Sequence, residues 1–136
     1  METYHVQIIH LTTGIVSCIT IWADEGETTD NIILRAAVDG QELTASHTHY
    51  FVAFQSLRDQ LLDLGYGTKC NGARTNAVAS PMMANVAKVY LVNMGEHARM
   101  KDVNQTFDFA DISEFPDTRQ QEEFLEAWGK SLTSPK

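Results

Sequence analysis

The dipeptide Asp39-Gly40 constrains the fold more strongly than any other feature of this sequence. It separates two β-type runs, residues 31–38 and residues 41–46. Asp-Gly favours a two-residue hairpin turn because both central positions of that turn need a positive φ. A turn of this length brings small and apolar side chains into two facing pairs on one side of the ribbon, Ala36 with Leu43 and Leu34 with Ala45.

Two further β-type runs precede this hairpin. Residues 4–11 and 15–22 are rich in isoleucine and valine, and the turn signal Thr-Thr-Gly lies between them. Residues 23–30 are polar and acidic with one glycine, and we expect a loop there. The first third of the chain is therefore predicted to form a four-stranded antiparallel meander.

Residues 48–64 are predicted to form the main helix. Ser46 or Thr48 can cap its start, and Gly65 suits the left-handed residue that ends many helices. The apolar side chains of this run recur at helical spacing and form one stripe: Tyr50, Phe54, Leu57, Leu61 and Leu64. We expect that stripe to cover one face of the sheet.

A second helix is predicted over residues 118–132. Asp117 or Thr118 can cap its start, and Gln120 or Gln121 is placed for a capping box. Its apolar stripe consists of Phe124, Leu125, Trp128 and Leu132.

These elements predict an α+β fold. An antiparallel β-meander sheet carries the two main helices, about 48–64 and 118–132, packed on it. A length of 136 residues suits one domain, so we expect a single domain over residues 1–136.

Charge and hydropathy exclude several classes of protein. A formal net charge of −8 argues against general nucleic-acid binding, which needs a basic surface, and suits either plain solubility or a basic protein partner. The first residues lack the pattern of a secretory signal, and no apolar run approaches the ~20 residues of a membrane helix. We therefore expect a cytoplasmic protein with no membrane partner. Its two cysteines, Cys18 and Cys70, are expected to be reduced.

The segment 65–101 differs from the rest of the chain because it is basic. It holds five of the ten basic residues and one acidic residue, a formal charge of +4. Within it, Asn71-Gly72 is a second hairpin signal, between strands expected at 66–70 and 73–79. A further strand is predicted at 87–93, and residues 99–104 can form one helical turn.

Polar and basic side chains of this segment are the candidate binding residues. Lys69 and Arg74 would be neighbours across the predicted hairpin, an unfavourable pair of like charges. Either acidic residues of the framework neutralise them, or an anionic ligand lies between them and is held by the Arg74 guanidinium. The same cations would make Cys70 the more reactive thiol. The candidate set is Asn71, Gly72, Arg74, Asn76, Ser80, Lys88, Tyr90 and Arg99.

Motifs for catalysis or cofactor binding are lacking. His47 and His49 resemble a metal pair, but no nearby side chain supplies a third ligand. His97 is the one histidine of the basic segment, and no nucleophile is fixed beside it in the sequence. There is no phosphate-binding glycine loop and no Gly-x-Ser-x-Gly elbow. We predict no catalytic residue, no metal and no cofactor, and leave enzymatic activity open.

The central motif resembles a group of short uncharacterised bacterial proteins, some of which lie near polymorphic toxin genes. The run from Leu64 to Arg74, which contains Cys-Asn-Gly-Ala-Arg, carries the resemblance, and Ser80 and the Lys-Val-Tyr that ends at Tyr90 extend it. The resemblance implies an immunity-type or toxin-associated role. The chain departs from the pattern where Pro81 follows Ser80 in place of glycine and where the glycine-rich turn is shortened. Protein binding tolerates these departures better than catalysis does.

Three functions remain. The first is a small protein-binding module, in the form of an immunity-like inhibitor of a bacterial toxin, with a basic protein as its partner. The second is a protein or enzyme that binds a small anion through the central segment 65–101. The third is a structural subunit of a homo-oligomer joined through sheet edges.

Overall fold

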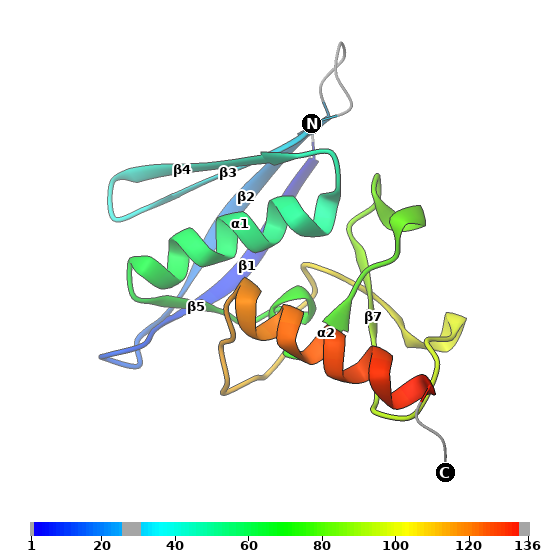
Figure 1. Ribbon diagram of the computed structural model, residues 1–136. Helices are drawn as coiled ribbons and strands as arrows, with labels where there is room; N and C mark the ends of the chain where they lie inside the picture. The colour runs from blue at the N-terminus through cyan, green and yellow to red at the C-terminus, as the bar shows by residue number, and fades with distance from the viewer. Residues whose placement is uncertain (1, 26–30, 134–136) are drawn as a thin grey trace.

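A computed structural model describes residues 2–25 and 31–133. Two antiparallel sheets and two helices make up the described chain (Figure 1), and the larger sheet is curled. This architecture confirms the predicted α+β class. The order of the five strands in the larger sheet is β4-β3-β2-β1-β5. Their bounds are β1 Glu2–His10, β2 Val16–Glu25, β3 Ile32–Val38, β4 Gln41–His47 and β5 Tyr66–Thr68.

The Asp39-Gly40 hairpin is confirmed in turn geometry and in register. Asp39 has φ 53° and Gly40 has φ 76°, as a two-residue turn of this type requires. Both predicted facing pairs, Leu34 with Ala45 and Ala36 with Leu43, are partners across β3 and β4. The four residues are buried, so this side of the ribbon contributes to the core.

The predicted loop over 23–30 is wrong at its start. Ala23 to Glu25 continue β2 and pair with the first residues of β3. Ala23 is buried in the core, and strand pairing therefore outweighs the polar composition of the run. Residues 26–30 of the predicted loop lie outside the described residues.

Helix α1, Tyr50–Asp63, covers one face of the larger sheet (Figure 1). Leu57 and Leu61 of its predicted stripe are fully buried. Gly65 follows the helix with φ 92°, as expected of a left-handed residue at this end. The predicted caps are wrong, because the side chain of His49 accepts the N–H of Phe51.

The hairpin predicted at Asn71-Gly72 does not form. Strand β5 pairs with β1, and residues Asn71–Ala73 make a short 3-10 turn, η1. Gly72 is not among the residues with a positive φ. A Cβ at Gly72 would lie 2.6 Å from the Thr106 Cγ2 and 3.0 Å from the Phe54 ring, so a close approach explains this glycine.

The rest of the central segment forms a small second sheet of order β6-β7-β8. Two 3-10 turns lie beside its strands. The turn η3 confirms a helical turn inside 99–104, but it is shorter than predicted because β8 begins at Val103. The bounds are β6 Ala77–Val78, η2 Pro81–Met83, β7 Lys88–Leu91, η3 Met100–Asp102 and β8 Val103–Gln105.

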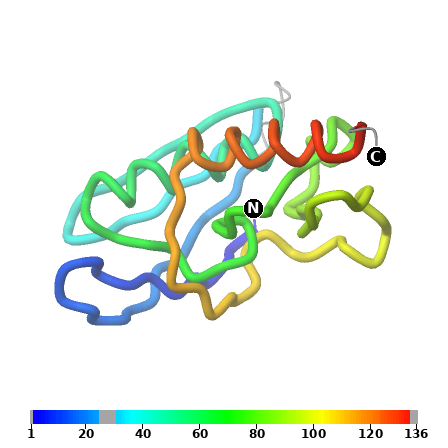
Figure 2. The backbone as a smooth tube through the Cα atoms, turned by 60° about the horizontal axis from the view of Figure 1, so that its bottom comes forward, coloured from blue at the N-terminus to red at the C-terminus, as the bar shows by residue number. Residues whose placement is uncertain are grey.

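Helix α2, Thr118–Thr133, lies beside α1 and contacts β6 of the smaller sheet (Figures 1 and 2). The capping box is confirmed for Asp117 and Gln120: the Asp117 N–H donates to the Gln120 Oε1 at 3.0 Å, and the Gln120 N–H donates to the Asp117 Oδ1 at 2.9 Å. Near its other end, the Trp128 Nε1 donates to the carbonyls of Asn93 and Glu96. The helix thus joins α1 to the turn after β7.

Within residues 2–25 and 31–133, neither helix combines the length and the apolar character that crossing a bilayer would require.

Candidate functional site

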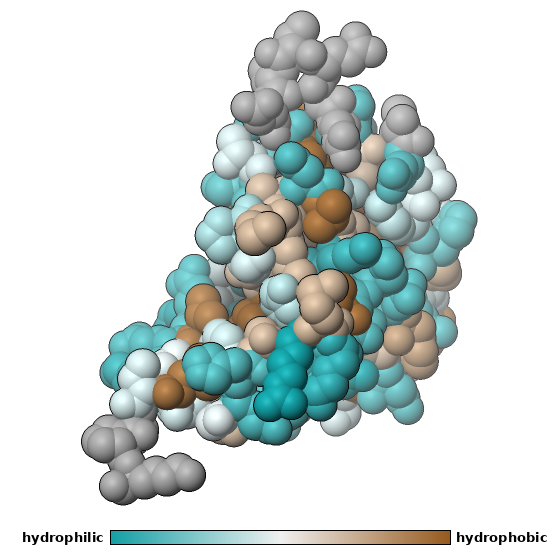
Figure 3. Space-filling view, turned by 90° about the vertical axis from the view of Figure 1, so that its right-hand side faces the viewer, coloured by the Kyte–Doolittle hydropathy of each residue, from teal (hydrophilic) through white to brown (hydrophobic). Residues whose placement is uncertain are grey.

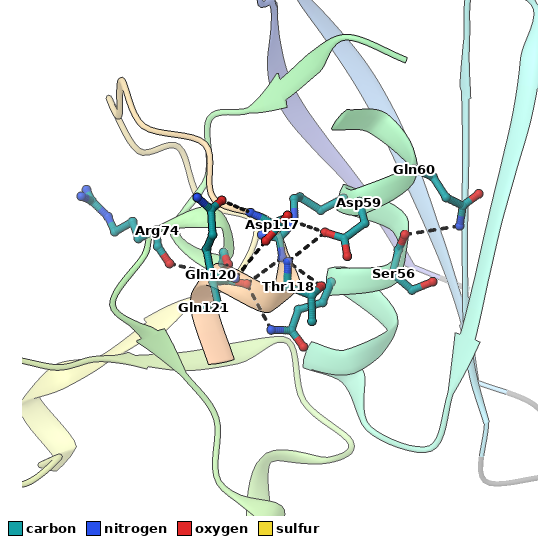
Figure 4. A network of polar contacts seen from close by, with 11 residues as sticks. Ser56, Asp59, Gln60, Arg74, Asp117, Thr118, Gln120 and Gln121 are labelled. Carbon is teal, nitrogen blue, oxygen red and sulfur yellow. Dashed lines mark hydrogen bonds and ion pairs between the residues drawn. The ribbon is translucent and has the colours of Figure 1, made fainter. Parts of the chain in front are cut away.

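A buried polar network joins α1, α2 and the η1 turn (Figure 4). Its centre on α1 is Arg58, which is 1% exposed. The Arg58 Nη2 donates to the Gln121 Oε1 at 2.7 Å and to the Thr118 Oγ1 at 3.3 Å. Its Nε donates to the Asp59 Oδ1 at 2.9 Å, and Asp59 also accepts the Thr118 N–H. Burial lowers the pKa of the guanidinium, and the Asp59 carboxylate opposes that shift.

The side-chain amide of Gln121 is the centre of the network on α2. Its Oε1 accepts from the Gln55 Nε2 at 3.1 Å as well as from Arg58. Its Nε2 donates to the Gly72 carbonyl at 2.9 Å and to the Arg74 carbonyl at 2.8 Å. Both acceptor positions and both donor positions are filled, so this glutamine fixes the η1 turn and leaves no group free for a ligand.

Sequence reasoning missed the role of these two polar side chains, although their spacing carries a signal. Arg58 lies four residues after Phe54 and three before Leu61, inside the apolar stripe of α1. Gln121 lies three residues before Phe124, in phase with the stripe of α2. A polar residue in phase with an apolar stripe predicts burial, but the partner that satisfies it depends on tertiary packing.

Arg74 and Asn76, two of the predicted site residues, line one open cavity of about 330 Å3. Asp111 and Glu114 line the same cavity. The Arg74 Nε donates to the Asn71 Oδ1 at 3.2 Å, which holds part of the guanidinium against the protein. Glu114 offsets the charge of Arg74, and Asp111 is paired with Lys69 at 3.2 Å, so the cavity has no net positive charge to attract an anion.

Lys69 is neutralised by an acidic residue of the framework, one of the two alternatives left open by the sequence. Its Nζ lies 3.2 Å from the Asp111 Oδ1 and 5.8 Å from the centre of the Phe109 ring. Lys69 and Arg74 were predicted to be neighbours across a hairpin, and this prediction is wrong because the hairpin does not form.

The remaining predicted site residues lie in other places. Arg99 lines a small surface cavity with His97, next to η3. Lys88 and Tyr90 are on β7, where they pair with residues of β8. Ser80 acts through its carbonyl, which lies 2.9 Å from the His49 Nε2. The structure brings Asn71, Arg74 and Asn76 close together, and it places Arg99 in a different cavity.

Histidine 49 has a structural role at the start of α1. Its Nδ1 accepts the Phe51 N–H, so the proton of a neutral ring is on Nε2, which faces the Ser80 carbonyl. The ring therefore connects the helix to the segment before η2. Over the described parts of the chain, no group of three or more histidine, cysteine, aspartate or glutamate side chains is arranged to hold a metal ion.

Cysteine 70 is buried in the core, and the expectation that it is the more reactive thiol is wrong. Burial raises the pKa of the Cys70 thiol to about 12. The thiolate is the reactive form, and at neutral pH this environment suppresses it. Cys18, in contrast, is exposed on β2.

A groove between α1, β6 and α2 is a further candidate for a binding site. Its volume is about 320 Å3. The walls are largely apolar, with Val52 of α1 37% exposed and Leu125 of α2 45% exposed. Gln55 and Gln121 of the buried network also line it. The full lining consists of His49, Phe51, Val52, Gln55, Ala77, Val78, Ala79, Pro81, Gln121, Glu122 and Leu125.

Apolar side chains are also exposed near the smaller sheet. Met82 of η2 is 95% exposed and Met100 of η3 is 82% exposed. Figure 3 shows the side of the molecule that carries these turns: hydrophobic residues form separate patches between hydrophilic ones. On this face the apolar surface is divided, so the groove remains the more defined binding feature.

A scan against protein-family models finds no matching family, and a search of curated proteins finds no match.

Proposed function

We propose that this protein is a small protein-binding module that holds a segment of a basic partner protein in the groove between α1, β6 and α2. The groove carries the proposal. It is concave and mostly apolar, and three separate elements form its walls. Apolar side chains of a partner gain free energy when such walls remove them from water.

The charge of the chain supports a basic partner. The net charge is −8, and the residues that line the groove include one acidic residue, Glu122, and no lysine or arginine. Acidic surfaces speed the encounter with a basic protein and select against acidic ones. The resemblance of the central motif implies that this partner would be a bacterial toxin. The protein would then inhibit the toxin by covering part of the toxin's surface.

The other two functions have less support. An anion in the Arg74 cavity would face the carboxylates of Asp111 and Glu114. A homo-oligomer through the edge of β4 would have to displace Gln60, whose Nε2 donates to the Thr44 carbonyl at 3.0 Å on that edge strand.

The test is a pull-down from a bacterial lysate with the tagged protein, analysed by mass spectrometry at low and moderate salt. Val52→Glu places a charge in the groove. Val86→Glu is the matched control, because Val86 is similarly exposed and does not line the groove. We expect one basic protein in stoichiometric amount with the parent and with Val86→Glu, and its loss with Val52→Glu. A clean lane with the parent, or equal capture by all three proteins, would overturn the proposal.

A further inference from the structure

The corner between β4 and α1 is held by two histidine rings in series. The His47 Nδ1 accepts the N–H of His49 at 3.0 Å, and the His49 Nδ1 accepts the N–H of Phe51 at 3.2 Å. Each ring thus binds the N–H of the residue two positions later, as a serine or asparagine side chain does at a helix start. A ring nitrogen can accept such a hydrogen bond only while it carries no proton of its own.

The same corner is tied to the turn η2, which contributes to the wall of the groove. The His49 Nε2 lies 2.9 Å from the carbonyl of Ser80, which precedes η2. The Tyr50 N–H donates to the carbonyl of Ala84, which follows η2, at 2.8 Å. Pro81, the first residue of η2, lines the groove together with His49. The start of α1 therefore positions this part of the wall.

A protonated His49 ring cannot keep both of its contacts in this geometry. The imidazolium carries an N–H on each nitrogen. Its Nε2–H can still donate to the Ser80 carbonyl, but its Nδ1–H then points at the Phe51 N–H, so two donors face each other across 3.2 Å. A positive charge at the start of a helix also opposes the helix dipole. Either the ring leaves Ser80 or the first turn of α1 moves.

The other titratable groups described near the corner are carboxyls and phenols, which ordinarily titrate outside the interval from pH 7.5 to pH 5.5. They are Glu122 of α2 in the groove, Tyr50 with Tyr4 and Glu2 on the side of β1, and Glu25 of β2, which lies across β3 from His47. Imidazole, in contrast, takes up a proton near pH 6.5. The two histidines are therefore the groups of this corner that change charge in that interval.

Protonation also changes the charge of the groove. Glu122 is the acidic residue of its lining, and a neutral His49 leaves that negative charge uncompensated. An imidazolium at His49 would offset it. A basic segment of a partner would then lose the electrostatic attraction that favours its entry.

We infer that the His47-Thr48-His49 corner is an acid-sensitive switch of the groove. Neutral rings cap α1 and hold the wall at η2 in place, and protonation below about pH 6 breaks the cap and offsets the negative charge of the groove. The switch follows from the hydrogen bonds of the corner. Release of a basic partner in acid is its consequence for binding, and that part rests on the proposed function.

The test is a pH titration of the isotope-labelled protein from pH 7.5 to pH 5.5, followed by NMR. At pH 7.5 the nitrogen signals of the His49 ring should show a proton on Nε2 and none on Nδ1. As the ring takes up its second proton, the Phe51 amide signal should shift, and its protection against hydrogen exchange should fall about fivefold relative to the intrinsic rate, the value of one helix cap. This titration needs no variant.

His49→Asn separates the switch from a general effect of acid. Its amide oxygen can accept the Phe51 N–H and does not titrate, so the Phe51 signal should no longer respond to pH. His10→Asn is the matched control. The His10 Nδ1 accepts the N–H groups of Thr12 and Thr13 in the turn after β1 and does not line the groove, so the response at Phe51 should remain.

The pull-down, repeated at pH 7.5 and pH 5.5, tests the consequence for binding. For the parent and for His10→Asn, capture of the basic partner should fall about threefold at pH 5.5. The ratio between the two pH values should be closer to one for His49→Asn. Glu122→Gln should keep the NMR response at Phe51, because the carboxylate takes no part in the cap. Thermal melts at pH 7.5 establish that each variant is folded.

The outcomes separate this inference from the function on which its second part rests. A Phe51 signal that ignores pH in the parent, or that responds equally in His49→Asn, would overturn the switch. Equal capture at both pH values would overturn acid release of the partner. If the pull-down finds no basic partner but the Phe51 response is present and is lost in His49→Asn, the switch stands and the protein-binding function fails.

Discussion

Gln121 is the residue on which the interior polar network depends. It is 2% exposed, and its amide connects side chains of α1 to two carbonyls of the η1 region. A buried amide that lost these partners would leave several polar groups unsatisfied at once. Gln121 therefore stabilises the fold by giving these buried polar groups hydrogen-bond partners, as well as by its own packing.

Replacement of Gln121 by leucine should destabilise the protein by about 2–4 kcal/mol, since it leaves buried carbonyls and the Arg58 guanidinium short of partners. Gln121→Glu keeps an acceptor for Arg58 but places a carboxylate oxygen against the Gly72 and Arg74 carbonyl oxygens, so it should also destabilise the protein. Urea unfolding followed by circular dichroism measures both. Equal stability of the leucine variant and the parent would contradict the structural role of the network.

We expect any side chain at Gly72 to clash with neighbouring atoms. Gly72→Ala places a methyl group 2.6 Å from the Thr106 Cγ2, and we expect a loss of about 1–3 kcal/mol in the free energy of unfolding. Thr106→Ser removes that Cγ2. The double variant should therefore recover part of the loss, which a double-mutant cycle measures. Additive effects would show that the clash is not with Thr106.

At the scale of strands and helices, features that depend on residues close together in the sequence could be predicted from the sequence. Asp39-Gly40 fixed a register because both partners of each facing pair lie within twelve residues. The capping box at Asp117 and Gln120 is equally local. The hairpin predicted at Asn71-Gly72 does not form, because β5 pairs with β1, which is far away in the sequence. Gln121 holds the η1 turn that forms there in its place. The eight candidate site residues were chosen as polar and basic side chains of the segment 65–101, and the groove itself needs three elements that no local pattern brings together.

The strand β4 forms one edge of the larger sheet, and an edge of this kind is a site for self-association. Gln60 of α1 covers one of its carbonyls, that of Thr44. Gln60→Ala should expose this edge and shift the protein toward dimers at concentrations where the parent is less associated. Asp63→Ala, an exposed change at the end of the same helix, is the control. Light scattering across a concentration series gives the mass; identical curves for both variants would argue against a protective role.

At the scale of the whole molecule, Cys70 makes stability depend on alkaline pH. The pKa of a cysteine thiol in the unfolded chain is about 9.0, whereas burial raises the pKa of Cys70 in the folded protein to about 12. Between these values the folded state binds more protons, so the free energy of unfolding falls as pH rises, by up to about 1.4 kcal/mol per pH unit. This contribution is fully present below pH 9.

Cys70→Ala should remove that part of the slope, and Cys18→Ala, at an exposed thiol, should leave it unchanged. Urea unfolding between pH 8 and pH 11 provides the comparison, because other groups that titrate in this range are common to all three proteins. A slope that is the same in the Cys70 variant would contradict the buried, protonated thiol.

The bonds from Gln121 to the Gly72 and Arg74 carbonyls also have a consequence for the order in which the chain is made. The meander of β1 to β4 consists of neighbouring strands and can pair as soon as it leaves the ribosome. The η1 turn precedes Gln121 by almost fifty residues and depends on it. We therefore expect the middle of a nascent chain to reach its final shape only when α2, which emerges after it, docks against it.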